Sequence, residues 1–408
     1  MNFGYLSSYF SGVAAKRLRA VEVSPSTSNQ HELNGSGALR QLLGDQEFTQ
    51  RPATFIWLGG ENEGITDPGW VSWYDARKRQ RHRTPEWRLY YPGTSVMELA
   101  EPGDLLILAK GTNDDIVLIV VPQTTTLENQ LIWLFGLEGG LGERFRLEEF
   151  GHGKDRELDF ATRYILDELG IEIAEPDAEY LDSLLDRFET RFPTTREFSA
   201  FARETIRGIS PLDAPDEALV SWMTHEEALF RRLERHIVSE RLQSGFAAGD
   251  QVDVDGFLQF SLSVQNRRKA RVGFALENHL EAVFSAHGLR FARGALTENR
   301  AKPDFLFPGE GEYRDPQFPS DRLAMLGAKS TCKDRWRQVL SEAQRIRQKH
   351  LLTLEPGISE NQTTEMQANA LQLVVPERIQ QTYSPGQQCW LMNLGQFIGH
   401  VRTQQDVH

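Results

Sequence analysis

The sequence has few of the features that mark membrane, secreted or zinc-finger proteins. Its 408 residues include two cysteines, Cys332 and Cys389, too few for a disulfide framework or a zinc finger. No segment reaches the ~18 apolar residues that span a bilayer, and the first 16 residues lack the basic start and apolar run of a signal peptide. We also find no internal repeat or low-complexity tract. These absences predict a globular protein of the reducing cytoplasm with no membrane partner.

Charge is unevenly distributed along the chain. The formal net charge of -13 argues against a polyanionic partner if it is taken alone. The segment from Glu138 to Glu189 has a net charge of -10, whereas Arg267 to Lys349 has +7 and Arg77 to Arg88 has +5. Because binding to a polyanion depends on local fields, two basic surfaces separated by an acidic middle are compatible with double-stranded DNA as the partner.

The length predicts two or three domains, and the sequence pattern changes twice along the chain. Up to about residue 135, short apolar runs at 54–58, 87–91, 104–110 and 115–121 alternate with turn signals, which favours a mainly-β barrel or pseudobarrel. Helical patterns follow at 158–169, 178–188 and 218–243. We therefore expect a β domain over 1–140, an acidic helical connector over 141–195 and a further domain over 196–408.

The third region combines helical and strand patterns. An amphipathic helix is predicted over 273–287, and strands are predicted over 303–307, 323–330, 350–354 and 371–375. A further helix is expected from Asp334, as its N-cap, to about Lys349, because Trp336, Val339, Leu340, Ala343 and Ile346 would share one apolar face. The fold expected for this region is α/β, with a mixed sheet flanked by helices.

Four residues of this region suit metal-dependent phosphodiester hydrolysis, which needs a hard cation held by oxygen ligands and a group that positions water. Asp304 follows Pro303 at a strand start, and Lys329 ends the next strand. In the common PD-(D/E)XK nuclease pattern an acid lies two residues before the lysine, but Gly327 is found here. Glu342, on the helix predicted to follow, can replace that acid, and Glu277 can supply a further one. Asp304, Lys329, Glu342 and Glu277 are thus candidate catalytic residues, with Asp304 and Glu342 as Mg²⁺ ligands.

Three sequence segments resemble those of a known enzyme family. They are 264–269 (VQNRRK), 302–308 (KPDFLFP) and 329–338 (KSTCKDRWRQ), and the likeness continues through Glu342 to Val375. From about Ser261 onward the chain closely resembles the catalytic half of EcoRII-like type IIE restriction endonucleases, of the PD-(D/E)XK superfamily. In that family the second acid is also displaced onto the helix. The resemblance implies that Asp304, Lys329 and Glu342 are catalytic, with Glu277 as an additional acid.

Lys333, Asp334 and Arg335 are candidates for reading the DNA sequence. Arginine can bind guanine through two hydrogen bonds, and aspartate can accept one from the cytosine amino group. The resemblance implies that these residues read a CC/GG half-site around a central base pair, so that CCWGG, CCNGG and CCGG remain open. The alternative is that Asp334 only caps a helix while the two basic side chains contact phosphates or solvent. Cys332 is expected to be a small buried residue.

The N-terminal half resembles, more weakly, the B3-like effector domain of the same enzymes, a pseudobarrel that binds a second copy of the target and inhibits the catalytic half until occupied. The candidate DNA contacts are His31, Arg81, Arg83, Glu86 and Arg88. The alternative is that residues 77–83 form a solvated loop.

The sequence thus predicts a magnesium-dependent restriction endonuclease that binds DNA as a homodimer, since a palindromic site mirrors a two-fold axis. A cognate cytosine methyltransferase is expected as a functional partner but not as a stable subunit. Two alternatives remain: a DNA-binding regulator whose nuclease half is only a scaffold, and a methylation-sensing nuclease on the same scaffold.

Overall fold

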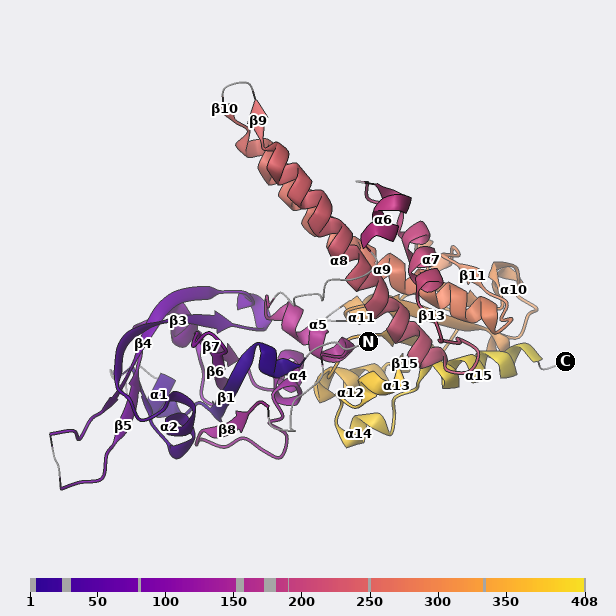
Figure 1. The fold of residues 1–408 in the computed structure, drawn as a ribbon. Coiled ribbons are helices and arrows are strands. Elements are labelled where there is room, and N and C mark those ends of the chain that lie inside the picture. The colour runs from indigo at the N-terminus through magenta and orange to yellow at the C-terminus, as the bar shows by residue number, and fades with distance from the viewer. Residues whose placement is uncertain are drawn as a thin grey trace. The chain divides into compact units, whose positions relative to one another are not determined.

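The structure, a computed structural model, describes residues 5–23, 31–79, 82–151, 158–171, 181–189, 191–248, 251–332 and 335–406. The chain divides into two compact units. Unit 1 comprises Met1–Ile171 with Pro356–Asn361, and unit 2 comprises Glu172–Glu355 with Gln362–His408. Among the described residues, none of the helices combines the length and the apolar character needed to cross a membrane. The elements of both units are labelled in Figure 1.

Unit 1 is organised around one eight-stranded sheet with the strand order β2-β5-β4-β3-β7-β6-β1-β8. Neighbouring strands are antiparallel, except that β3 and β7 are parallel. The strands are β1 (Phe10–Arg17), β2 (Glu32–Asn34), β3 (Phe48–Trp57), β4 (Thr66–Asp75), β5 (Trp87–Tyr90), β6 (Leu105–Gly111), β7 (Ile116–Val121) and β8 (Arg146–Glu149). Around them lie η1 (Leu6–Ser8), α1 (Ala20–Val23), α2 (Gly37–Leu43), η2 (Gly60–Asn62), α3 (Ser95–Leu99), α4 (Thr126–Leu134) and α5 (Phe160–Glu168).

The β-rich N-terminal region is confirmed, because the four apolar runs form β3, β5, β6 and β7. The first five residues of β6 are all buried, as expected of a strand covered on both faces. In the core, the rings of Trp73 and Trp87 stack with centroids 5.0 Å apart. Gly35 lies beside this pair, and a Cβ there would come within 2.6 Å of the Trp73 ring. Glycine at this position is therefore required by close packing.

Unit 2 contains a five-stranded mixed sheet with the order β11-β12-β13-β14-β15. Strand β12 pairs antiparallel with both β11 and β13, whereas β14 pairs parallel with both β13 and β15. The strands are β11 (Ala292–Arg293), β12 (Phe305–Phe307), β13 (Ala324–Lys329), β14 (Lys349–Thr353) and β15 (Leu371–Val374), with β9 (Ala247–Ala248) and β10 (Gln251–Val252) in a separate two-stranded ribbon. The predicted α/β character of this region is confirmed.

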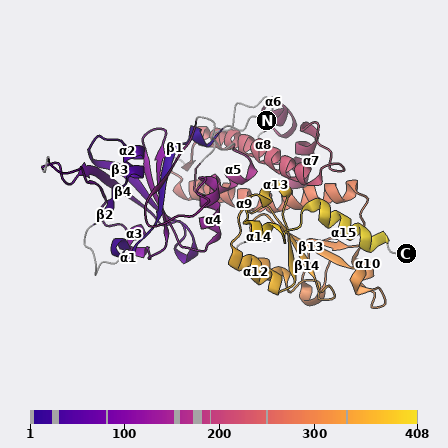
Figure 2. The same cartoon turned by 90° about the horizontal axis from the view of Figure 1, so that it is seen from below.

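Unit 2 also contains helices. They are α6 (Leu181–Phe188), α7 (Thr195–Thr205), α8 (Pro215–Ser244), α9 (Val254–Ala286), α10 (Glu310–Arg314), α11 (Trp336–Val339), α12 (Glu360–Ala368), α13 (Glu377–Gln380), α14 (Pro385–Gln388) and α15 (Leu394–Asp406), with short turns η3 (Glu298–Arg300) and η4 (Ser320–Arg322). Figure 2 shows α9 and α15 beside β13 and β14. Phe284 of α9 and Phe397 of α15 both pack on Phe307 of β12, with ring centroids 5.3 and 5.7 Å away. This aromatic cluster fixes α9 against the strands that carry the candidate site.

Two predicted helices differ from the structure. The helix expected from Asp334 to Lys349 is confined to Trp336–Val339, so Glu342 lies in the irregular segment that follows and not on a helix. The helix expected over 273–287 begins instead at Val254, which makes α9 33 residues long. The apolar pattern nevertheless predicted buried positions correctly, because Trp336, Val339, Ala343 and Ile346 are all buried.

Candidate active site

Asp304 and Lys329 meet at one edge of the mixed sheet. Asp304 immediately precedes β12, and Lys329 is the last residue of the neighbouring antiparallel strand β13. Asp304 Oδ2 accepts hydrogen bonds from Lys329 Nζ at 2.8 Å and from the backbone N–H of Ala328 at 2.7 Å. The side chains of Asp304 and Lys329 are 17% and 23% exposed. The pair is therefore oriented by the sheet and still open to a ligand.

Glu342 lies near this pair and is held in an unfavourable environment. Burial, together with the negative charge of Asp304, raises the pKa of Glu342 to about 7, and the charge of Lys329 opposes the shift. Its Oε2 atom is buried and has no hydrogen-bond partner among the described residues. A carboxylate with these properties is typical of a functional site, because a positive ligand would offset its cost.

The structure explains why Gly327 replaces the usual acid. A Cβ at this position would lie 3.0 Å from Val339 Cγ2 and 3.4 Å from Leu351 Cδ1. A carboxylate there would displace apolar side chains and be buried beside them. Val339 belongs to α11, three residues before Glu342. The short helix thus occupies the usual acid position and brings another acid toward Asp304.

Glu277 of α9 also faces the site, but it already has a cationic partner. Its pKa is raised mainly by burial, with contributions from Asp304, while Arg293 and Lys329 oppose the shift. Arg293 Nη2 donates to Glu277 Oε2 at 2.7 Å, and Arg293 Nη1 donates to Glu281 Oε2 at 2.7 Å. The sequence therefore predicted the proximity of Glu277 to Asp304, whereas Arg293 was missed.

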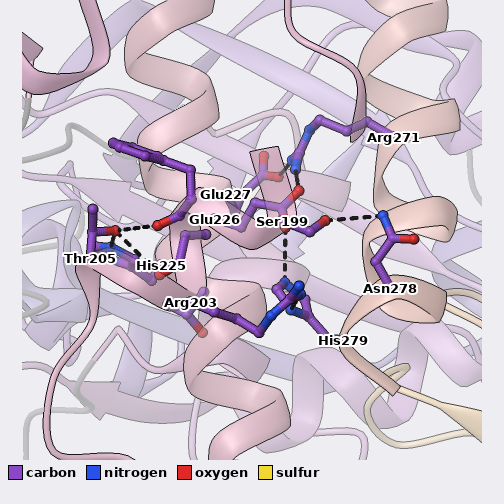
Figure 3. Close-up of polar contacts among 12 residues, drawn as sticks. Ser199, Arg203, Thr205, His225, Glu226, Glu227, Arg271, Asn278 and His279 are labelled. Carbon is purple, nitrogen blue, oxygen red and sulfur yellow. Dashed lines mark hydrogen bonds and ion pairs between the residues drawn. The ribbon is translucent and has the colours of Figure 1, made fainter. Parts of the chain in front are cut away.

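A buried polar cluster anchors α9 to α7 and α8, as Figure 3 shows. Glu226 of α8 accepts from Arg271 Nη1 at 2.9 Å and lies 2.9 Å from His279 Nε2. Arg203 of α7 lies 3.0 Å from His279 Nδ1. Because arginine can only donate, Nδ1 must accept, which makes His279 a neutral imidazole with its proton on Nε2. Burial lowers the pKa of His279, in agreement with the neutral form of the imidazole.

This cluster fixes the position of Glu277, which is two residues before His279 on the same helix. Asn278, between them, donates to Ser199 Oγ at 3.2 Å and accepts from Arg293 Nη1 at 2.8 Å. The cluster joins residues up to 79 positions apart in the chain. No local motif of the sequence signals such long-range pairs.

Of the three predicted sequence-reading residues, Lys333 and Asp334 lie outside the described residues. Arg335 is exposed and begins α11 as its N-cap. Its backbone N–H donates to the carbonyl of Cys332 at 2.8 Å, and its Nη2 atom donates to the carbonyl of Thr331 at 3.2 Å. Cys332 is fully buried, as predicted.

Glu355 holds the backbone at Cys332 and was not found from the sequence. Its carboxylate accepts a hydrogen bond from the backbone N–H of Cys332. Its own carbonyl accepts from Tyr383 Oη at 2.6 Å, and the residue is only 3% exposed. An acid beyond the end of β14 thus holds the backbone immediately before residues 333–335.

The predicted effector contacts lie in unit 1. His31 is exposed and precedes β2, which pairs with β5. Arg88 of β5 forms an ion pair with Glu86, so these two side chains are brought together. Arg83 is exposed in the segment before β5, and Arg81 lies outside the described residues.

Residues 230–398 match the family model described as EcoRII C terminal. The type II restriction enzyme EcoRII of Escherichia coli is 42% identical over 238 residues, which are 58% of this chain and 57% of that protein. This chain thus spans little more than half of the length of that curated relative.

Two solved structures have low overall similarity. A complex of metal-depleted Ecl18kI with uncleaved, modified DNA has a TM-score of 0.44 and 16% identity, covering 55% of this chain and 83% of that chain. A complex of the restriction endonuclease PspGI with substrate DNA has a TM-score of 0.43 and 15% identity, covering 53% of this chain and 95% of that chain. The segment that matches the family model includes Glu277, Asp304, Lys329 and Glu342. Residues 230–398 of this chain are therefore similar to the EcoRII C-terminal family.

Proposed function

We propose that this protein is a type II restriction endonuclease that hydrolyses double-stranded DNA at a CC/GG-type palindromic site. One observation carries the proposal: Asp304, Lys329 and Glu342 converge at one edge of the sheet within the EcoRII-like segment. The raised pKa of Glu342 and its unpartnered oxygen are costs that a DNA-binding scaffold alone would not need. This favours an enzyme over a regulator.

The residues present suit Mg²⁺ held by Asp304 and Glu342. Both supply the hard oxygen atoms that this ion prefers, and Mg²⁺ commonly binds proteins through one or two carboxylates together with water and substrate phosphate. Among the described residues, no group of three or more His, Cys, Asp or Glu side chains is arranged to hold a metal. When bound, the ion would polarise the phosphodiester and lower the pKa of its water.

Lys329 and Glu277 would act beside the ion. Lys329 Nζ, held 2.8 Å from Asp304 Oδ2, places a positive charge where the attacked phosphate gains negative charge. Glu277 already accepts a charge-assisted hydrogen bond from Arg293, so it is suited to orient water rather than to bind the metal directly.

Lys333, Asp334 and Arg335 are proposed to read the half-site. The test is a panel of duplexes that carry CCWGG, CCNGG or CCGG variants, with and without cytosine methylation. Cleavage of one class identifies the central base pair, whereas equal cleavage of all duplexes would contradict sequence reading. Cleavage restricted to methylated duplexes would favour a methylation-sensing nuclease, and a cognate cytosine methyltransferase would protect the sites of a conventional one.

Replacing Glu355 by Ala is expected to weaken discrimination more than catalysis. The change removes the carboxylate that accepts the Cys332 N–H and so loosens the backbone before residues 333–335. The ratio of kcat/KM for the preferred duplex to that for a duplex with one changed base pair should fall about tenfold. Glu355→Gln supplies an amide oxygen that can accept the same hydrogen bond from the Cys332 N–H, and should keep most of the ratio. An unchanged ratio in Glu355→Ala would show that this contact does not position the loop.

The N-terminal unit is proposed to be a B3-like domain that binds a second DNA copy as an effector. The proposed boundaries are 1–140 for this domain, 141–195 for the acidic connector and 196–408 for the catalytic domain. The proposed contacts are His31, Arg81, Arg83, Glu86 and Arg88.

An uncleavable duplex carrying the site should therefore accelerate cleavage of a single-site plasmid. Arg83→Ala should reduce that acceleration several-fold, because one phosphate or base contact is lost. Arg40, which pairs with Asp45 on the surface of unit 1, offers a matched control as Arg40→Ala. Equal acceleration in both variants would contradict the assignment of Arg83.

The active form is proposed to be a homodimer, in which each copy cuts one strand of the palindrome. A two-fold protein axis would then coincide with the axis of the DNA site.

A further inference from the structure

A short turn just before Asp304 also contacts the chain segment of the second proposed metal ligand. We define the turn as residues 297–301, which include η3. Its backbone is closed by hydrogen bonds from the Thr297 N–H to the Ala301 carbonyl at 2.9 Å and from the Ala301 N–H to the Glu298 carbonyl at 3.0 Å. Two residues, the second a proline with a restricted φ, separate the turn from Asp304. The turn is therefore joined to this ligand by a short connection.

Two side chains of the turn hold the backbone immediately after Glu342. Glu298 Oε2 accepts a hydrogen bond from the Gln344 N–H at 3.2 Å, and Thr297 Oγ1 accepts one from the Ala343 N–H at 3.4 Å. Both N–H groups lie in the irregular segment that follows α11. Because this segment is not helical, its backbone N–H groups depend on such side chains for their partners.

Glu298 is itself oriented by a further contact. Tyr313 is buried, and its Oη atom donates to the same Oε2 atom of Glu298 at 2.5 Å. Burial would raise the pKa of Glu298, but the hydrogen bonds from Tyr313 and from the Gln344 N–H hold this pKa below its ordinary value. The carboxylate is therefore ionised at neutral pH, and hydrogen bonds to an ionised acceptor are stronger than those to a neutral one.

The backbone is strained in both segments that this contact joins. Asn299 and Arg300 of the turn have φ values of 57° and 61°, and Ala343 has a φ of 46°. Residues other than glycine adopt this left-handed region at a cost, and such strain persists only where surrounding contacts maintain it. The hydrogen bonds of Thr297 and Glu298 are contacts of this kind.

The remaining contacts of the segment hold its far end. Arg345 donates to the carbonyls of Asp315 and Phe318 at 2.8 and 2.7 Å. These hydrogen bonds do not involve Glu298. Loss of the Glu298 carboxylate should therefore release the backbone beside Glu342 and leave the rest of the segment in place.

We propose that Glu298 is a positioning residue that sets the separation of the two carboxylates proposed to hold the metal ion. The turn is joined to Asp304 through the chain and to the segment after Glu342 through hydrogen bonds, so it fixes both ligands with one link. This inference rests on the proposed function, in which Asp304 and Glu342 bind the ion. Replacing residues that orient metal ligands typically lowers metal affinity or activity by ~10–100-fold.

Binding of Mn²⁺ tests the proposal without relying on turnover. The full chain is mixed with an uncleavable duplex that carries the site, and free Mn²⁺ is measured by electron paramagnetic resonance, with the duplex alone as background. Glu298→Ala should weaken Mn²⁺ binding at least ~10-fold. Glu298→Gln should stay near wild type, because both donors share one oxygen atom and an amide oxygen can accept from both. Glu310, which pairs with Arg314, provides Glu310→Ala as a control with wild-type affinity.

The metal dependence of cleavage separates positioning from a merely structural role. In Glu298→Ala, the Mg²⁺ concentration that gives half of the maximal single-turnover rate should rise by about the same factor as the Mn²⁺ dissociation constant. Binding of the duplex in a chelator should stay near the wild-type value. A merely structural role would lower Tm and leave the metal dependence of the folded protein unchanged.

The outcomes distinguish this inference from the proposed function. Wild-type Mn²⁺ affinity in a folded Glu298→Ala protein would overturn the positioning role and leave the proposed nuclease intact. A wild-type complex that binds no Mn²⁺ would overturn the proposed metal site and the inference with it. If Glu298→Ala does not fold, Thr297→Val removes the acceptor of the Ala343 N–H and should weaken Mn²⁺ binding several-fold. Unchanged affinity in that variant would overturn the proposal.

Discussion

Replacing Asp304 by Ala is expected to abolish DNA cleavage, lowering the rate by at least ~10³-fold. The variant loses one of two proposed metal ligands and leaves Lys329 Nζ and the Ala328 N–H without their shared acceptor. Each factor of ten corresponds to about 1.4 kcal/mol of transition-state stabilisation. The measurement is the single-turnover rate on a duplex that the wild-type protein cleaves.

Two controls separate chemistry from folding and binding. Asp321→Ala removes an exposed acid just before the opposite end of β13 and should cleave at the wild-type rate. Binding of the duplex by Asp304→Ala should be retained, because the change removes a negative charge from a surface that faces a polyanion. Cleavage by Asp304→Ala within tenfold of wild type would rule out its role as a metal ligand.

Replacing Glu342 by Gln is expected to abolish cleavage and also to stabilise the metal-free protein above neutral pH. The folded pKa of about 7 lies above the usual value of 4.5. Between these values the unfolded chain is ionised while the folded site is protonated, so stability falls as pH rises through this window and stays lower above it. Glutamine has no charge to desolvate. At pH 8 the free energy of unfolding of Glu342→Gln should exceed that of wild type by on the order of 1–2 kcal/mol after solvent screening, which corresponds to about 2–5 °C in Tm.

Thermal melts with a chelator at pH 5 and pH 8 measure this effect. The difference in Tm between Glu342→Gln and wild type should be small at pH 5 and clearly positive at pH 8. The exposed Glu365, which pairs with Arg337 on the surface, provides Glu365→Gln as a control without this pH dependence. A Glu342→Gln variant that cleaves normally, or that is less stable than wild type at pH 8, would contradict the assignment.

Strands β12 to β15, which carry or flank the candidate site, were predictable from the sequence, whereas the segment containing Glu342 was not. Apolar residues near the active site recur with a helical period, yet the helix ends at Val339. Ala343 has a φ of 46°, which interrupts a right-handed helix. Lys349 Nζ donates to the carbonyls of Ala343 and Ile346, at 3.2 and 2.9 Å, and so satisfies backbone groups that a helix would pair. Periodicity predicted which residues are buried but not the backbone that buries them.

The length of α9 was underestimated for a related reason. The sequence shows a core-facing apolar pattern in this helix only from near Arg271, where burial begins. The preceding residues have the same period on a face that this chain leaves exposed. A sequence gives the period of an apolar stripe, but not whether its own chain covers it.

The candidate site was predicted in part. Asp304 and Lys329 follow from a short motif on neighbouring strands, and Glu342 follows from its place after Lys329 and from the resemblance. Arg293 and Glu355 could not be found in this way, because they act through partners 16 and 23 residues distant in the chain. Such contacts are determined by the packing of α9 and β14, and no local pattern encodes them.

The most direct measurement is cleavage of an unmethylated plasmid with several CCWGG sites, with Mg²⁺ or with a chelator, followed by sequencing of the ends. We expect discrete cuts at CC/GG sites that require Mg²⁺ and are absent in Asp304→Ala. Specific binding without cleavage in Mg²⁺ would contradict the proposed nuclease activity and favour a DNA-binding regulator. Cleavage that is unchanged in Asp304→Ala would place the active site elsewhere in the chain.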